Sequence, residues 1–153
     1  MTQRIKIGLA MNSNTVSAEL RLRLVTSQQT IVPLMSGFFY SREDPYAIRI
    51  ALHVDLGEPV EWIFARDLLS MDIGGRGGIG DVRVWPSAGS GGGEPGSVLN
   101  IELSSPFGQA HLEASAGQVA DFLRRTYRIV PDGQESDHID IEAELNDLLS
   151  LGL

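Results

Sequence analysis

Strict alternation of apolar and polar residues is the feature that most restricts how this chain can fold. Between residues 15 and 25 every second residue is apolar: Val16, Ala18, Leu20, Leu22 and Leu24. Because successive side chains of a strand point to opposite faces of a sheet, this spacing predicts a strand with one buried face. Residues 46–54 repeat the pattern. We therefore expect a fold that is built on β-sheet.

Seven segments of the chain have strand character. They are residues 15–25, 30–40, 46–54, 60–65, 80–85, 97–104 and 108–114. The connections between them carry turn-forming residues and no crossover helix, which favours an antiparallel meander. Residues 87–96 are mostly glycine and serine. This composition predicts a mobile hairpin loop between the fifth and the sixth strand.

A helix is predicted to begin after the last strand. Ser115 and Gln118 have the spacing of a capping box. The apolar residues that follow fall on one helical face: Val119, Phe122, Leu123 and Tyr127. Pro131 ends this helix. A second helix is predicted from a stripe of Ile141, Leu145, Leu148 and Leu149.

Strands followed by helices predict an α+β domain, with antiparallel β-sheets of about seven strands and C-terminal helices. The length of 153 residues suits one domain with a sizeable core. A second methionine, Met11, stands shortly before the first strand. We therefore expect residues 1–11 to be an N-terminal extension and residues 12–153 to form the single domain.

The charge of the chain is concentrated at its C-terminal end. The net charge is −8, and the seven acidic residues from Asp132 onward have no lysine or arginine among them. The body is nearly neutral, so it lacks the positive field that drives binding to nucleic acid or anionic membranes. No cysteine is present, which excludes disulfides, cysteine-ligated zinc and thiol nucleophiles. No apolar run approaches the ~18 residues of a membrane span, and we expect a cytoplasmic protein.

Residues 75–80, GRGGIG, match the glycine fingerprint of nucleotide-binding loops. In a dinucleotide-binding unit this loop follows a strand and opens a helix, whose N-terminus faces the pyrophosphate. Here the glycines follow a short helical segment, residues 66–71, and lead into the strand at residues 80–85. The only lysine is Lys6, which leaves a kinase-like site without its phosphate-pairing residue. We therefore predict a connecting loop and no nucleotide cofactor.

An iron site is one alternative to the simpler interpretation that the polar residues of these strands form a solvated sheet face. His53 and Asp55, with His111 or His138, have the residue types of a two-histidine, one-carboxylate iron site, and His111 and Glu113 form a similar pair. His53 and Asp55 lie opposite the apolar face of their strand, where polar pairs two residues apart are common. We therefore expect no metal.

Single-stranded nucleic-acid binding is the alternative function. It needs aromatic side chains for stacking and a basic groove for the backbone. The residues that could supply these are Tyr46, Trp62, Trp85, Arg21, Arg23, Arg49 and Arg83. The acidic balance and the near absence of lysine make nucleic acid an unlikely partner, because phosphate contacts dominate such affinities.

Several phrases of the sequence resemble one known family. They are DPYA at residues 44–47, VEWIFARDLL at 60–69, GDVRVWP at 80–86, LSSP at 103–106 with EA at 113–114, and FLRRT at 122–126. In this order they are similar to the SsgA-like sporulation and cell division proteins of actinomycetes. The resemblance runs from about Asn12 to Leu149. The chain departs from the family in the residues before Met11 and in a longer glycine loop after Pro86.

The resemblance implies a function without catalysis, cofactor or small-molecule substrate. Members of the family act at septation sites, where they recruit the tubulin-like division protein FtsZ and promote its polymerisation with the help of an SsgA-like paralogue. The implied structure is a homotrimer of a fold that is likened to the whirly nucleic-acid binders. Attachment to the septum membrane is then the task of a membrane-anchored partner.

Partner contacts are predicted from residue type and from the family phrases. Tryptophan and arginine supply much of the energy at protein interfaces. On this basis the predicted partner-binding residues are Arg66, Arg83, Trp85, Pro86 and Phe107.

Overall fold

The computed structural model describes residues 14–28, 30–54, 57–69, 77–79, 82–106, 108–138 and 149. Within these ranges eight strands form one antiparallel sheet, in the order β4-β3-β2-β1-β8-β7-β6-β5. The strands are β1 (Thr15–Val25), β2 (Ile31–Ser41), β3 (Asp44–His53), β4 (Val60–Ala65), β5 (Gly77–Ile79), β6 (Val82–Ser87), β7 (Val98–Ser105) and β8 (Gly108–Ser115). All seven predicted strands are confirmed, and the short strand β5 is additional.

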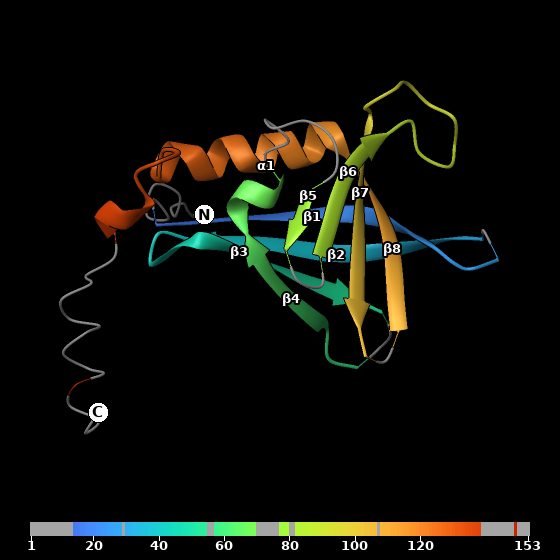
Figure 1. The fold of residues 1–153 in the computed structure, drawn as a ribbon, viewed down its shortest axis with the longest axis horizontal. Helices are drawn as coiled ribbons and strands as arrows, with labels where there is room; N and C mark the ends of the chain where they lie inside the picture. Colours follow the sequence, from blue (N-terminus) through green and yellow to red (C-terminus); the bar gives the residue numbers. More distant parts are fainter. Residues whose placement is uncertain are drawn as a thin grey trace, which may run out of the picture.

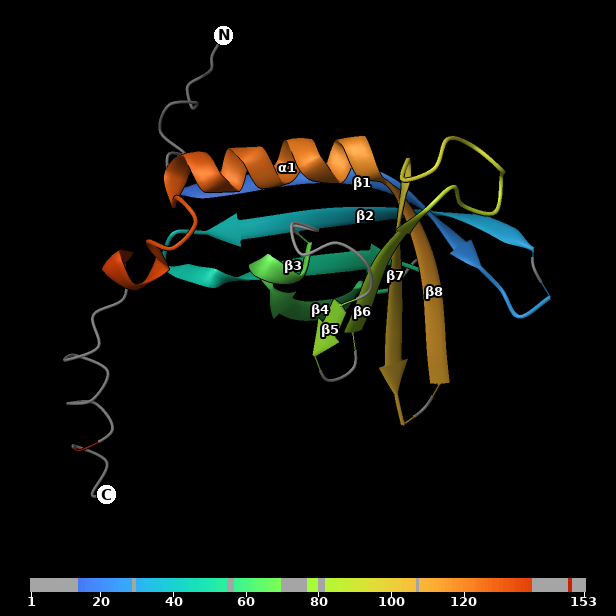
Figure 2. The ribbon, with the colours of Figure 1, turned by 45° about the horizontal axis from the view of Figure 1, so that its top comes forward.

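The sheet consists of two meanders that meet at β1. Strands β1 to β4 pair in sequence order, and so do β5 to β8. The two halves are joined where β1 pairs with β8, through Arg23↔Glu113, Leu24↔Leu112 and Val25↔His111. Strands β6 to β8 run steeply across the direction of β1 and β2 in both Figure 1 and Figure 2. The sheet is therefore strongly curled, with an inner and an outer face.

Helix α1 (Ala116–Ile129) covers part of the inner face, next to β1 (Figure 2). Its first turn is capped as the sequence predicts, because the Ser115 hydroxyl accepts a hydrogen bond from the Gln118 N–H at 3.2 Å. Phe122 packs edge-on against Phe38 of β2, with ring centroids 5.6 Å apart. The predicted apolar face of this helix is therefore the one that closes the core.

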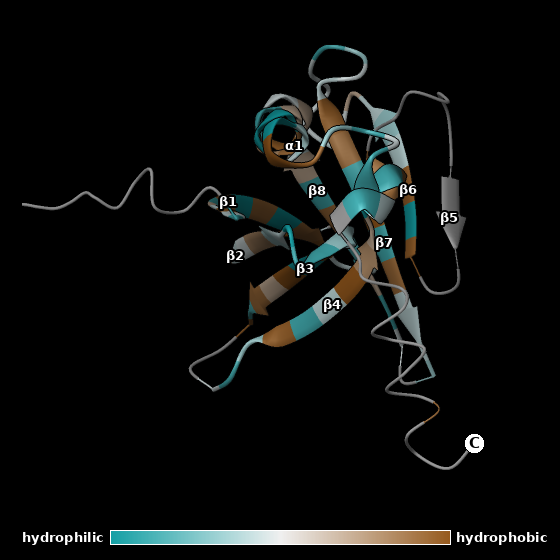
Figure 3. Cartoon of the chain, turned by 90° about the vertical axis from the view of Figure 1, so that its left-hand side faces the viewer, coloured by the Kyte–Doolittle hydropathy of each residue, from teal (hydrophilic) through white to brown (hydrophobic). Residues whose placement is uncertain are grey.

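The alternation that predicts the strands is visible in the sheet. Bands of apolar and polar residues alternate along β4 and β8 in Figure 3. In β1, Val16, Leu20 and Leu22 are buried in the core, whereas Arg21 is exposed on the other face. Burial of one face per strand thus holds the sheet in register.

Two short 3-10 helices complete the described elements, η2 (Arg66–Leu69) and η3 (Glu135–His138). Helix η2 matches the helical turn predicted for residues 66–71. The predicted second helix lies outside the described residues except for Leu149, and so does the predicted N-terminal extension. No helix in the described ranges has the length and apolarity needed to cross a bilayer.

Candidate protein-interaction site

Three of the predicted partner-binding residues lie side by side on β6. Arg83 and Trp85 point away from the core, because Val82 and Val84, which alternate with them, are buried on the inner face. The Arg83 side chain is 57% exposed and lies 3.9 Å from the Glu102 carboxylate across the β6–β7 pair. Pro86 is also exposed, but in the strand it alternates with these two residues and is paired with the core residue Leu99. We call Arg83 and Trp85 on the outer face the β6 surface. Phe107 lies outside the described residues.

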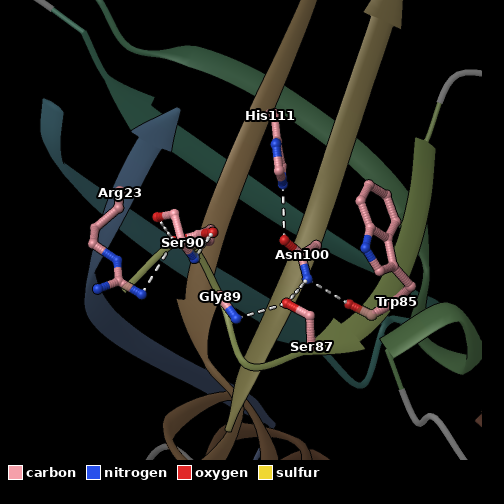
Figure 4. A network of polar contacts seen from close by, with 8 residues as sticks. Arg23, Trp85, Ser87, Gly89, Ser90, Asn100 and His111 are labelled. Carbon is pink, nitrogen blue, oxygen red and sulfur yellow. Dashed lines mark hydrogen bonds and ion pairs between the residues drawn. The ribbon is translucent and has the colours of Figure 1, made fainter. Parts of the chain in front are cut away.

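Trp85 is held in place by a polar network on the outer face (Figure 4). Its ring stacks on the His111 ring of β8, with centroids 5.5 Å apart. His111 Nε2 lies 2.8 Å from Asn100 Oδ1 on β7, the strand between them. Asn100 Nδ2 donates to the Trp85 carbonyl oxygen at 3.1 Å and to Ser87 Oγ at 2.7 Å. The indole is therefore an oriented, partly exposed group.

The same contacts determine which ring nitrogen of His111 donates a hydrogen bond to Asn100. The Trp85 carbonyl oxygen can only accept a hydrogen bond, so the atom of Asn100 that faces it is the amide nitrogen. The atom of Asn100 that faces His111 is consequently the oxygen, which also only accepts. His111 Nε2 therefore carries the proton, and its hydrogen bond orients the ring that supports Trp85.

Glu113 anchors the glycine-rich loop to the sheet through Ser90 and Arg23, which are both labelled in Figure 4. Its side chain is only 3% exposed and forms an ion pair with Arg23 of β1 at 3.1 Å. The carboxylate also accepts the backbone N–H of Ser90 at 2.8 Å and the Ser90 hydroxyl at 3.0 Å. The predicted mobile loop is thus bound to the sheet at its beginning. It joins β6 and β7 as the predicted hairpin connection.

Gly89 makes this anchoring possible. It has a φ of +79°, and a Cβ at this position would lie 2.7 Å from Cγ2 of Val98. Only glycine combines this backbone conformation with such a close approach.

Arg66, another of the predicted contact residues, is buried. It is 1% exposed, and its guanidinium donates to the carbonyl oxygens of Thr126 and Val130 at 3.3 and 2.8 Å. It also pairs with Glu135 at 2.8 Å and lies over the ring of Tyr127. In this chain Arg66 therefore fastens the end of β4 to the end of α1 and to η3.

The groups around Arg66 have shifted pKa values. Burial alone would raise the pKa of Glu135, but hydrogen bonds from Arg66 and from backbone N–H groups, with the Arg66 charge, lower it below its ordinary value. Burial raises the pKa of Tyr40 to about 12, although Arg66 opposes the shift. Burial also raises the pKa of Asp67, helped by the negative charges of Asp132 and Glu135.

The histidines and acidic residues that were weighed as possible metal ligands lie apart or already have other partners. His53 is exposed at the end of β3, whereas His111 and Glu113 belong to the network above. Asp55 and the side chain of His138 are outside the described part. In the described ranges, one acidic group has carboxylate oxygens within 4.8 Å of one another: Asp67, Asp132 and Glu135. Arg66 neutralises Glu135, which leaves the negative charges of Asp67 and Asp132 in this group.

The residues predicted for nucleic-acid binding do not form a basic platform. Arg23 pairs with Glu113, Arg49 with Glu61 at 2.8 Å, and Arg83 faces Glu102. Trp62 lines a pocket on the inner face. The positive charges of the outer face are thus largely compensated by glutamates, which removes the attraction that phosphates require.

The described part of the glycine fingerprint, residues 77–79, lies in a β-hairpin. Gly77–Ile79 form β5, which pairs with β6 through Gly77↔Val84, Gly78↔Arg83 and Ile79↔Val82. The element that follows is a strand, as the sequence predicts, so the helix N-terminus of a phosphate-binding loop has no counterpart at this position.

Asn100 was not predicted as a site residue, although the sequence contains a sign of its role. It is a polar residue within the apolar run Val98, Leu99, Asn100, Ile101 and is 2% exposed. A buried amide requires hydrogen-bond partners, and this one finds them on both neighbouring strands. The partners themselves depend on the strand register.

Comparison with known proteins identifies the group to which this fold belongs. Residues 34–135 match the family model described as Streptomyces sporulation and cell division protein, SsgA. The chain is 49% identical to the sporulation-specific cell division protein SsgB of Thermobifida fusca over 93% of this chain and 100% of the relative. The identity to the protein of the same name from Streptomyces coelicolor is 46%, over 90% and 98% of the two chains.

A solved structure agrees with this relationship. It was reported with the statement that mutations in SsgB correlate to longitudinal cell division during sporulation of Streptomyces coelicolor, and it is 47% identical with a TM-score of 0.74. The match covers 82% of this chain and 95% of that one. Sequence and fold lead to the same conclusion: the chain belongs to the SsgA family of sporulation and cell division proteins.

Proposed function

We propose that this protein acts in sporulation-specific cell division as a scaffold without catalytic activity. One observation carries the proposal: relatives that are 46–49% identical over at least nine-tenths of this chain are named sporulation-specific cell division protein SsgB. Such identity over the whole domain, with a solved structure of similar fold, supports a shared role. The protein works at the division septum, with a protein as its ligand.

FtsZ is the partner that it recruits, and polymerisation of FtsZ is the step that it promotes. The β6 surface supports this, because it presents a tryptophan and an arginine on one face of an ordered strand. Oriented aromatic and arginine side chains are the usual anchors of protein interfaces. With a net charge of −8 the chain gains little from long-range attraction to an acidic partner, so contact depends on these desolvated anchors.

A whirly-like homotrimer would present three such surfaces at once. A polymer offers repeated partners, and three linked contacts convert weak single affinities into strong attachment. An SsgA-like paralogue assists at the septum, and a membrane-anchored partner supplies the tether. Light scattering tests the assembly: three copies of 16.6 kDa give about 50 kDa. A monomer at tens of micromolar would exclude the trimer.

Co-sedimentation with GTP-assembled FtsZ tests the function. We expect the protein to pellet with filaments at moderate salt, and Trp85→Ala to weaken this by about 30-fold, the effect of losing a hot spot of about 2 kcal/mol. Arg21→Ala, an exposed arginine of β1, is the matched control and should leave the pelleted fraction unchanged. Circular dichroism confirms that each variant is folded. If the folded wild-type protein neither pellets nor changes filament assembly, direct recruitment is wrong.

A further inference from the structure

An apolar pocket of about 320 Å³ opens on the inner face of the sheet. It is lined by Leu34 and Leu52 on one side and by Leu103 and Leu112 on the other, with Val60 and Trp62 of β4 at its edge. No residue of α1 lines it, so it lies where the helix leaves the inner face uncovered. Ser105 and Gln109 supply the polar side chains of its lining.

Strand β4, beside this pocket, is an edge of the sheet. It pairs with β3 from Leu52↔Val60 to Ala47↔Ala65, and among the described residues its other side pairs with no strand. Val60 is 47% and Ile63 64% exposed. An apolar edge strand with free N–H and C=O groups is a template for a further strand.

Both ends of β4 are acidic. Glu58 is exposed just before the strand. Asp67 follows it, and its carboxylate lies within 4.8 Å of those of Asp132 and Glu135. Arg66 pairs with Glu135, and the ion pairs of the described residues include neither Asp67 nor Asp132. Negative charge therefore remains uncompensated beyond the end of the strand.

We propose that the edge of β4 binds an extended segment of a partner protein. The segment pairs with residues 60–65, places alternate aliphatic side chains in the pocket and meets Asp67 and Asp132 with a lysine or arginine. This is strand addition, in which main-chain hydrogen bonds give affinity and pockets for every second side chain give specificity. The site is distinct from the β6 surface and does not depend on binding to FtsZ.

The dimensions of the pocket favour a peptide over a small molecule. Its volume is at the lower end of the ~300–1,000 Å³ that ligand sites enclose. Aliphatic side chains match its lining, and the backbone that carries them satisfies the edge of β4. The uncompensated carboxylates attract a cationic residue at one flank, so the pocket, the edge and the charge select one kind of segment.

The test uses the full chain and fluorescein-labelled nonapeptides with valine at alternate positions and serine between. Three versions carry two lysines, two serines or two glutamates at the flanks. Fluorescence anisotropy should rank them in the order lysine, serine, glutamate, with about twofold to fivefold between steps, as exposed ion pairs contribute. Amide NMR signals of residues 60–65 should shift on binding. Absence of binding at millimolar peptide, or shifts confined to other strands, would overturn the proposal.

Substitutions separate the pocket from the charge. Val60→Lys places an ammonium group at the pocket and should weaken every peptide by at least about tenfold. Asp67→Asn should remove the preference for lysine flanks but retain binding of the serine version. Arg124→Ala, on the exposed side of α1, is the control and should change nothing. Equal affinity of all variants would refute the site.

A second copy of the chain at the β4 edge, or a cation at the carboxylates, would give results that differ from those of peptide binding. In residues 60–65, alternate amides bond to β3 and are protected in any case. Slow hydrogen exchange, without peptide, of the amides that point away from β3 would show that a second copy already covers the edge, which would overturn the proposal. Calcium chloride alone tests the carboxylates as a cation site. Saturable calcium binding that Asp67→Asn abolishes would assign them to a metal and refute their role toward lysine.

Discussion

Replacement of Arg66 by methionine should destabilise the protein more than any surface substitution. Arg66→Met removes the hydrogen bonds to the carbonyl oxygens of Thr126 and Val130 and leaves the Glu135 carboxylate buried without its cation. Removing one partner of a buried ion pair costs about 3–5 kcal/mol. For a domain of this size that corresponds to a fall in Tm of about 6–20 °C. Arg49→Met, which breaks an exposed pair with Glu61, should cost at most about 1 kcal/mol.

The effect should also depend on pH. In the wild type the folded pKa of Glu135 is lowered, so its contribution is present above the ordinary carboxylate pKa and is lost as pH falls through the folded value. Without Arg66, burial raises that pKa, and protonation then relieves the variant as pH falls. The difference in unfolding free energy should therefore be largest near pH 7 and clearly smaller at about pH 4.

Urea denaturation at pH 7 and pH 4, at one protein concentration, measures both quantities. The double variant Arg66→Met with Glu135→Leu removes the unpaired carboxylate and should recover part of the loss at pH 7. A loss below about 1 kcal/mol for Arg66→Met, or a loss that is the same at both pH values, would refute the role assigned to this pair.

Three further predictions concern the loop anchor and the core. Gly89→Ala should lower stability more than Gly92→Ala, because both positions have positive φ, +79° and +72°, but only the first lacks room for a Cβ; differential scanning calorimetry compares them. Glu113→Gln should accelerate hydrogen exchange of the Ser90 amide, which loses a charged acceptor; an unchanged rate would show that the loop is held by other contacts. Tyr40, with a pKa of about 12, should stay un-ionised in an absorbance titration to pH 11. Because its folded pKa is raised, the free energy of unfolding should fall as pH rises above the ordinary tyrosine value of ~10. Ionisation of Tyr40 near pH 10 would contradict its burial.

Period-two patterns predict elements whose side chains are divided between core and solvent. Residues 15–25 and 60–65 form β1 and β4 with the predicted bounds. Strand β5 was missed because two of its three residues are glycines and carry no apolar alternation. Its conformation comes from pairing with β6, which is a tertiary effect.

The candidate site was predictable only where its residues are close in sequence. Arg83 and Trp85 share a face because they are two residues apart in a strand. Arg66, in contrast, was predicted at an interface because arginine is common there. Its burial depends on an ion pair with Glu135, which is distant in sequence and is brought close only by the fold. The support of Trp85 by His111 likewise follows from the register of three strands.

The sheet order has a consequence for how the chain acquires its structure. Among the strands of the described ranges β1 is synthesised first, yet one of its neighbours is β8, which is synthesised last. Hairpins within each meander close short loops, whereas the pair Val25↔His111 closes a loop that contains most of the domain. Contacts between such distant residues slow folding, because closing the long loop costs chain entropy before the favourable energy of the contact is gained. During synthesis on the ribosome, the apolar face of β1 to β4 remains exposed to solvent until α1 has been made. We therefore expect the first half of the chain to be prone to aggregation until the second half has emerged and packed against it.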